Sequence, residues 1–270
     1  MAESKPLRYF LQSPNSKSST TQYGNNAEVG KYVQVEDAQI YYEVYGKGKP
    51  FVVLHGGGVG CAYEMGCFVD KLIEKYQVCL ISTRGHGKSE IGTKEYTYEM
   101  KATDVCAVIE EFTKESVIVL GFSDGAYTGY KLASMYPDRV ERLIAIGAGE
   151  LIPGLRKVMM NYDEFYRQDP DYINQQLSLM PKPDRLREFW KTYSDFWNKV
   201  TVSKELFFSI KCPVLLICGE LDGNAPLDTV LATYRMIRKC NLSVIPNAGH
   251  VCFIDNFPAV WAAIEPFLNQ

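Results

Sequence analysis

The chain has 270 residues, of which 46% are hydrophobic and 23% are charged, and its formal net charge is −3 at pH 7. This composition is ordinary for a soluble globular protein with one large domain. A slightly acidic chain lacks the basic stripe that nucleic-acid binding requires, and no apolar run approaches the ~20 residues that cross a bilayer. We therefore expect neither a nucleic-acid partner nor a membrane anchor.

The cysteines and histidines bear on the compartment and on cofactors. Several of the eight cysteines fall inside apolar strand or helix patterns, which is typical of buried free thiols in a reducing compartment. The apolar run near residues 7–11 is too short for a signal peptide. We predict a cytoplasmic protein, with export behind a removed signal peptide as the open alternative. With no C-x-x-C pair and three histidines, we expect no metal and no cofactor.

Near residue 29 the sequence changes from a polar segment to segments with strand patterns. Residues 1–28 are polar and show no hydrophobic period, so they are predicted to form a flexible N-terminal arm, with Tyr9 to Leu11 as a possible anchor. Residues 32–35 and 40–45 are predicted to form two strands. Such a pair is typical of an antiparallel hairpin at the edge of a mixed sheet.

Apolar, β-branched segments then alternate with helical patterns. The segments that predict buried strands are 51–54, 78–81, 117–120, 143–146, 214–218 and 242–245. Helices are expected between them, two of them at about 62–75 and 226–238. This alternation indicates a mostly parallel, doubly wound α/β sheet, whose core we place at residues 29–149 and 211–270.

Residues 150–210 do not continue this alternation of strand and helix patterns. They contain no apolar strand pattern, and prolines separate stretches rich in aromatic and methionine residues. We predict a helical cap over the C-terminal edge of the sheet, where α/β proteins bind their ligands. Most of its aromatic side chains are expected to pack internally, and Trp190 and Trp197 are assigned to the substrate pocket.

A G-x-S-x-G motif stands where a strand pattern changes into a helical one. The apolar run 117–120 leads into Gly121-Phe122-Ser123-Asp124-Gly125. In this context the serine occupies a strained turn that holds its hydroxyl clear of the sheet, and the flanking glycines let strand and helix approach closely. Ser123 is therefore the candidate nucleophile.

A serine nucleophile needs a base, and histidine is suited to that task near neutral pH. His250 follows the last predicted strand, in a loop at the edge of the sheet where Ser123 is expected. His55 and His86 lie in glycine-containing turns instead. His250 is therefore predicted to be the base.

The acid that orients the histidine should follow another strand. Asp222 lies just past the strand 214–218 and 28 residues before His250. Glu220 is nearer the strand, and Asp228 stands where a helix-capping role is expected. We assign the acid to Asp222, with Glu220 as the alternative.

Taken together, these motifs resemble the α/β-hydrolase family from about Tyr32 to the C-terminus. The resemblance rests on the order serine, acid, histidine and on the segments His55-Gly56-Gly57-Gly58, Gly121-Phe122-Ser123-Asp124-Gly125, Gly219-Glu220-Leu221-Asp222 and Gly249-His250. It implies the α/β-hydrolase fold and an oxyanion hole made by the backbone N–H groups of Gly57 and Asp124. It also implies that His55 is structural. Gly58 and Phe122 are assigned to the substrate pocket.

Two positions depart from the family pattern or refine it. Ser82 stands two residues before Arg84, where the family often has an aspartate, which affects a structural contact only. A serine at position 123 excludes the haloalkane dehalogenase and epoxide hydrolase branches, which resemble this chain but use aspartate there.

Asp124 admits two interpretations. Its carboxylate could interact with the N-terminus of the following helix, or it could face the crevice and pair with a substrate ammonium group. The S-D-G form resembles the amino-acid ester hydrolases related to biphenyl-hydrolase-like proteins. The ammonium hypothesis is kept as the second interpretation.

The residues together predict a serine hydrolase that cleaves a small to medium carboxylic ester through an acyl-enzyme. Within the same fold, an amino-acid ester hydrolase, a perhydrolase or a carbon–carbon bond hydrolase stays open. The contrasting hypothesis is a non-catalytic, receptor-like ligand-binding protein. The expected partner is a small-molecule ester, and the chain is expected to be a monomer or a homodimer.

Overall fold

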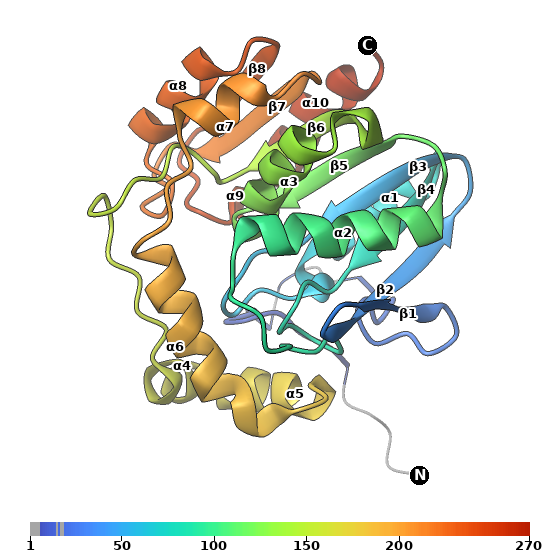
Figure 1. The fold of residues 1–270 in the computed structure, drawn as a ribbon, viewed down its shortest axis with the longest axis vertical. Helices are drawn as coiled ribbons and strands as arrows, with labels where there is room; N and C mark the ends of the chain where they lie inside the picture. The colour runs from blue at the N-terminus through green and yellow to red at the C-terminus, as the bar shows by residue number, and fades with distance from the viewer. Residues whose placement is uncertain (1–5, 15, 17–18) are drawn as a thin grey trace.

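The computed structural model describes residues 6–14, 16 and 19–270, and within them eight strands form one sheet (Figure 1). The strands are β1 (Gly30–Val35), β2 (Ala38–Gly46), β3 (Lys49–Leu54), β4 (Tyr76–Ile81), β5 (Val117–Phe122), β6 (Val140–Ile146), β7 (Val214–Gly219) and β8 (Cys240–Ile245). Their order across the sheet is β1-β2-β4-β3-β5-β6-β7-β8. β1 and β2 pair antiparallel, β2 pairs antiparallel with β4, and the remaining pairs are parallel. The predicted mixed α/β sheet is confirmed.

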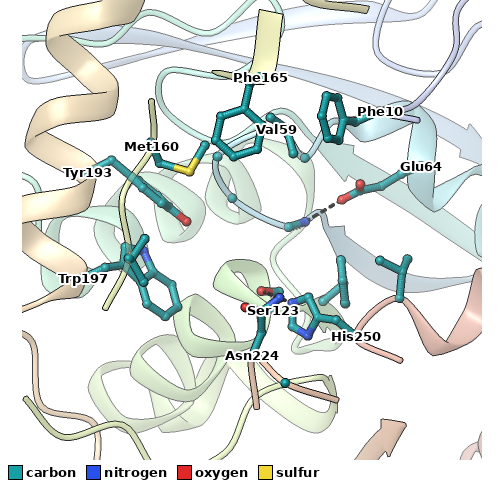
Figure 2. Close-up of a pocket in the computed structure, with 18 of the residues that line it drawn as sticks. Phe10, Val59, Glu64, Ser123, Met160, Phe165, Tyr193, Trp197, Asn224 and His250 are labelled. Atoms are coloured by element: carbon teal, nitrogen blue, oxygen red, sulfur yellow. Dashed lines mark hydrogen bonds between the residues drawn. The ribbon is translucent and has the colours of Figure 1, made fainter. Parts of the chain in front are cut away.

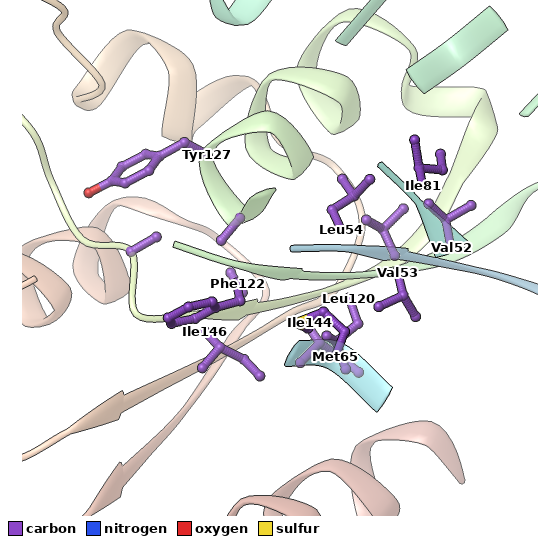
Figure 3. Close-up of a cluster of buried hydrophobic side chains, with 14 of the residues drawn as sticks. Val52, Val53, Leu54, Met65, Ile81, Leu120, Phe122, Tyr127, Ile144 and Ile146 are labelled. Carbon is purple, nitrogen blue, oxygen red and sulfur yellow. The ribbon is translucent and has the colours of Figure 1, made fainter. Parts of the chain in front are cut away.

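The strands β5 and β7 are apolar along their whole length because helices cover both faces of the sheet. Every residue of β5 and β7 is buried. β3 pairs in parallel with β5, and Leu54 at the end of β3 lies opposite Gly121. This register brings the loop after β3 and the turn after β5 to the same edge of the sheet. Figure 3 shows the apolar side chains beneath that edge, among them Val53, Leu120 and Ile144.

The helices that flank the sheet are α1 (Gly66–Leu72), α2 (Tyr98–Phe112), α3 (Asp124–Met135), α8 (Leu227–Met236), α9 (Cys252–Asp255) and α10 (Phe257–Leu268). α2 packs against α3, which lies on β5 and β6. α1, α9 and α10 meet through Phe68, whose ring centroid is 5.0 Å from that of Phe253 and 5.2 Å from that of Phe257.

The expected helix over 62–75 is shorter and divided. Residues Ala62–Met65 form a 3₁₀ turn, and α1 then covers Gly66–Leu72 before β4 begins at Tyr76. Gly66 lies against the ring of Tyr23, and a side chain there would overlap that ring. The change of helix type therefore falls at a close contact with the N-terminal part of the chain.

The segment 150–210, called here the cap segment, contains α4 (Tyr162–Gln168), α5 (Pro170–Leu179), α6 (Leu186–Trp197) and α7 (Lys204–Ser209). α4, α5 and α6 lie apart from the helices on the sheet (Figure 1), whereas α7 packs against α3 and α8. An antiparallel bridge between Leu151 and Val202 joins the two connections to the sheet. Pro170 occupies the first turn of α5, where the side chain of Asp169 accepts a hydrogen bond from the N–H of Tyr172.

The described part of residues 1–28 corrects the picture of a free arm. Leu7 and Tyr23 are buried, and Arg8 forms an ion pair with Asp169 of the cap segment at 2.6 Å. The carboxylate of Glu43 accepts hydrogen bonds from the N–H groups of Gly24 and Asn26. Polar composition suggested mobility, but these side chains find partners far away in the sequence. Residues 1–5, 15, 17 and 18 lie outside the described residues.

Among the described residues, no helix is both long and apolar enough to cross a bilayer.

Candidate active site

Ser123 occupies the turn between β5 and α3 with a backbone φ of 51°, a conformation that costs strain for any residue with a Cβ. A side chain at Gly125 would overlap the backbone carbonyls of Leu54 and His55, and one at Gly121 would overlap the carbonyl of Gly125. The glycines on both sides of the motif are therefore required by close packing. The turn holds Ser123 at the edge of the sheet where β3 also ends.

The three residues predicted to act together lie in hydrogen-bond contact. The Oγ of Ser123 is 2.9 Å from Nε2 of His250. The other ring nitrogen of His250, Nδ1, lies 2.9 Å and 3.0 Å from the two carboxylate oxygens of Asp222. His250 belongs to the loop between β8 and α9, and Asp222 follows β7. The parallel strands thus bring residues 123, 222 and 250 together at one edge.

Asp222 is held as a charged acceptor. Its side chain is fully buried, and its Oδ1 also accepts hydrogen bonds from the N–H groups of Asn224 and Ala225, each at 2.8 Å. Burial acts against ionisation, but the hydrogen bond and charge interaction with His250 and these N–H groups outweigh it and hold the pKa of Asp222 below its ordinary value. The alternative acid, Glu220, instead accepts a hydrogen bond from the N–H of Asn247 at 3.0 Å.

The other two histidines serve the fold. His55 is fully buried, and its Nε2 accepts a hydrogen bond from the N–H of Thr83 at 2.9 Å. Its Nδ1 therefore donates to the carbonyl of Gly56, which ties the glycine loop to the sheet. Burial lowers the pKa of His55 well below its ordinary value and lowers the pKa of His86 to about 4. Both rings are thus neutral near pH 7.

A cavity of about 490 Å³ opens beside Ser123 and His250 (Figure 2). Of the predicted pocket and oxyanion-hole residues, Gly57, Gly58, Phe122 and Trp197 line it. Phe122 also packs against the ring of His250, with their centroids 5.0 Å apart. This size suits a small organic ligand.

The assignment of Trp190 to the pocket is wrong. Trp190 is 2% exposed and packs inside the cap segment, with its ring 5.5 Å from that of Phe165 and 6.0 Å from that of Tyr162. It lies on α6 two turns before Trp197, and at that level the same helix face meets α4 rather than the cavity. Trp190 and Trp197 share one face of α6, so helical spacing alone cannot separate these two environments.

The side chain of Asp124 does not face the cavity, which corrects the hypothesis of a substrate ammonium site. Its carboxylate is fully buried, pairs with the ammonium group of Lys101, and accepts hydrogen bonds from the hydroxyls of Tyr98 at 3.1 Å and Tyr96 at 3.5 Å. The first interpretation, that the carboxylate interacts with the N-terminus of its own helix, did not include the ion pair with Lys101. The available signal was Lys101 itself, a lysine within the buried stripe of α2.

Five further residues of the cavity wall were not anticipated. Glu64 accepts a hydrogen bond from the N–H of Gly56 at 2.8 Å, and burial raises its pKa to about 8. Arg156 donates to the carbonyl of Asn224 and lies 4.5 Å from the centre of the Trp197 ring. Lys157, Tyr193 and the ring of Phe10 also line the cavity. None of these positions belongs to a motif, so the sequence held no local signal for them.

Among the described residues, no group of three or more histidine, cysteine, aspartate or glutamate side chains is placed to hold a metal ion.

Comparison with known proteins agrees with this architecture. Residues 49–181, from β3 to just beyond α5, match the sequence profile of a family described as alpha/beta hydrolase fold. The chain belongs to the α/β-hydrolase family. The predicted family and fold class are confirmed.

The hydrolase is similar in sequence to 2-hydroxy-6-oxo-6-(2'-aminophenyl)hexa-2,4-dienoic acid hydrolase of Metapseudomonas resinovorans, with 21% identity over 281 residues that cover 95% of this chain and 96% of the relative. A solved serine hydrolase involved in carbazole degradation superimposes with a TM-score of 0.75 and 20% identity, covering 89% of the hydrolase and 98% of that chain. A thermophilic esterase from Thermogutta terrifontis has a TM-score of 0.66 and 19% identity, covering 88% and 98%. At these identities the solved structures show the shared fold.

Proposed function

We propose that this α/β hydrolase is a serine hydrolase that cleaves a carboxylic ester through an acyl-enzyme, with Ser123 as nucleophile, His250 as base and Asp222 as orienting acid. The observation that carries the proposal is the chain of contacts from Ser123 Oγ to His250 Nε2 at 2.9 Å and from His250 Nδ1 to Asp222 at 2.9 Å. A hydroxyl so placed can lose its proton to the imidazole as it attacks.

The first half-reaction forms the acyl-enzyme. Ser123 Oγ bonds to the ester carbonyl carbon while His250 takes the hydroxyl proton, and Asp222 stabilises the resulting imidazolium. The carbonyl oxygen becomes an oxyanion, which the N–H groups of Gly57 and Asp124 are proposed to bind. Loss of one such donor costs ~3 kcal/mol of transition-state stabilisation. The carbon–oxygen bond then breaks, and His250 returns its proton to the leaving alcohol.

The second half-reaction regenerates the serine. A water molecule gives a proton to His250 and attacks the acyl carbon, and collapse of the second oxyanion breaks the bond to Ser123 Oγ. His250 returns the proton to the serine, and the carboxylic acid leaves.

The charges of the cavity wall support a substrate that carries a carboxylate. Arg156 and Lys157 both line the cavity, and no described acidic side chain forms an ion pair with either of them. The acidic side chain in the same wall, Glu64, is mostly protonated near pH 7 because its pKa is about 8. An anionic ester would therefore enter a cavity with net positive charge.

Carbon–carbon bond hydrolysis is the second candidate, favoured by the similarity to the Metapseudomonas resinovorans enzyme. The compound in that enzyme's name is an oxo acid with no ester or amide bond, so its hydrolysis must break a carbon–carbon bond. That compound also bears a carboxylate, which fits the same charged wall. Serine attack on its ketone carbonyl would use the same base and oxyanion hole.

The test compares matched substrates with and without a carboxylate. We expect turnover of p-nitrophenyl butyrate and faster turnover of the monoester p-nitrophenyl succinate, with Ser123→Ala abolishing both and Arg156→Ala removing the preference for the anionic ester. A 2-hydroxy-6-oxohexa-2,4-dienoic acid, followed by loss of its dienol absorbance, tests the second candidate. If neither substrate class is turned over faster than by Ser123→Ala, the catalytic proposal fails and a receptor-like role is favoured.

A further inference from the structure

Tyr193 is a buried tyrosine of α6 whose hydroxyl points into the cavity (Figure 2). The residue is 4% exposed, and its ring is fixed by the rings of Tyr96, Trp197 and Phe189, with centroids 5.5, 5.9 and 6.1 Å away. Among the described residues, no acceptor makes a hydrogen bond with this hydroxyl, whose polar neighbour, the indole N–H of Trp197, is itself a donor. A buried donor that faces a cavity without an acceptor is costly unless a ligand completes the bond.

The position of this hydroxyl relative to Gly57 indicates what the ligand atom is. A side chain at Gly57 would overlap the Tyr193 hydroxyl on one side and Cβ of Asp124 on the other. The hydroxyl therefore lies against the α-carbon of Gly57, between the cap segment and the two residues whose N–H groups are proposed to bind the oxyanion. An oxygen atom bound by those N–H groups would lie next to the hydroxyl of Tyr193.

The hydroxyl keeps its proton near neutral pH. Burial is the main cause, and the nearby Asp124 carboxylate adds to it, so the pKa of Tyr193 lies well above its ordinary value of 10. Tyr193 is thus a hydrogen-bond donor and not a base. Its fixed ring leaves little rotational freedom to lose when a ligand binds.

We propose that the hydroxyl of Tyr193 donates a third hydrogen bond to the substrate carbonyl oxygen, beside those from the N–H groups of Gly57 and Asp124, as that oxygen becomes an oxyanion. The inference rests on the proposed function. It makes the cap segment part of the catalytic machinery, because α6 then completes the oxyanion hole. It applies equally to an ester and to a ketone carbonyl, since both form a tetrahedral oxyanion on serine attack.

The test is Tyr193→Phe, which removes one oxygen and keeps the ring contacts. Removal of one oxyanion donor lowers kcat by roughly 10²–10³-fold, so we expect kcat with the best ester to fall by about 100-fold while KM changes little. The affinity for a trifluoromethyl ketone of matching shape, which forms an oxyanion on Ser123, should fall by a similar factor. The affinity for the alcohol product, which has no carbonyl oxygen, should be unchanged. Tyr166→Phe, which alters a tyrosine of α4 outside the cavity wall, is the matched control and should keep parental values.

Two results would overturn the inference. One is a Tyr193→Phe variant with the kcat and ketone affinity of the parent. The other is a fall in kcat with unchanged ketone affinity, because a structural defect need not weaken binding of the oxyanion. Failure of the proposed function looks different, since the parent itself would then show no turnover that depends on Ser123.

Discussion

Lys101 and Asp124 form an ion pair that is closed off from water directly behind Ser123, with their side chains 1% and 0% exposed. Lys101 belongs to α2 and Asp124 is the first residue of α3, so the pair ties the two helices together at the turn that carries the serine. Tyr98 donates to the second carboxylate oxygen at 3.1 Å. The contact that fixes the Asp124 side chain therefore also fixes the N–H proposed to bind the oxyanion.

The first prediction concerns this pair. Lys101→Met leaves the Asp124 carboxylate buried without its cation, and we expect the free energy of unfolding to fall by about 3–5 kcal/mol. The double variant Lys101→Met with Asp124→Asn has no buried charge and should recover most of that loss. Urea denaturation of the parent, the single variant and the double variant measures both values. Equal stability of the single and double variants would show that the pair is not coupled.

The second prediction separates the two candidate acids. Asp222→Asn cannot hold the required tautomer of His250 or stabilise its charged form, so kcat should fall by about 10⁴-fold. Glu220→Gln, two residues earlier in the same loop, should stay within about twofold of the parent because the glutamate contacts the N–H of Asn247 and not the histidine. Steady-state kinetics on the best ester compares them. The opposite ranking would move the acid to Glu220.

The third prediction follows from the raised pKa of Glu64. Its pKa is about 8 in the folded protein against an ordinary 4.5, so the folded protein holds a proton that the unfolded chain releases between those pH values. The unfolded state then binds fewer protons, and the free energy of unfolding declines as pH rises from about 5 to 8. Glu64→Gln should have a smaller decline over that window. Urea denaturation at pH 5, 6.5 and 8 provides the comparison, and identical slopes in both proteins would contradict it.

The fourth prediction concerns the N-terminal part of the cavity wall. The ring of Phe10 lies 5.6 Å from those of Phe165 and Tyr172 and closes one end of the cavity. Phe10→Ala enlarges that end, so kcat/KM for p-nitrophenyl octanoate relative to the acetate should rise severalfold. Leu11→Ala, at an adjacent residue that is 58% exposed, is the control and should keep the parental ratio. An unchanged ratio in Phe10→Ala would mean that acyl chains bind elsewhere.

The sheet and the three residues around Ser123 could be anticipated from short stretches of sequence. Each buried strand is a compact apolar run, and parallel strands necessarily end at one edge, so residues after β5, β7 and β8 had to approach each other. The glycines at positions 121 and 125 predict the tight turn at Ser123, because the close approach of strand and helix leaves no room for a side chain at either position. These local patterns are enough to bring the three residues together at one edge of the sheet.

The remaining features of the site depend on contacts between segments that no local pattern connects. Trp190 and Trp197 were both assigned to the pocket, but only the positions of α4 and the sheet decide that Trp190 packs in the cap segment and Trp197 lines the cavity. A polar composition suggested that residues 1–28 are free, whereas Arg8 has its partner 161 residues away at Asp169.

The amino-acid sequence alone thus determined the family, the alternation of strands and helices along the chain, and the residues that meet at Ser123. These follow from short-range patterns and from the geometry of parallel sheets. The tertiary structure alone decided where Asp124, Glu64 and Tyr193 point, since the orientation of a side chain depends on packing by distant segments. For a buried polar group, the partner that packing supplies also decides its charge and its hydrogen bonds.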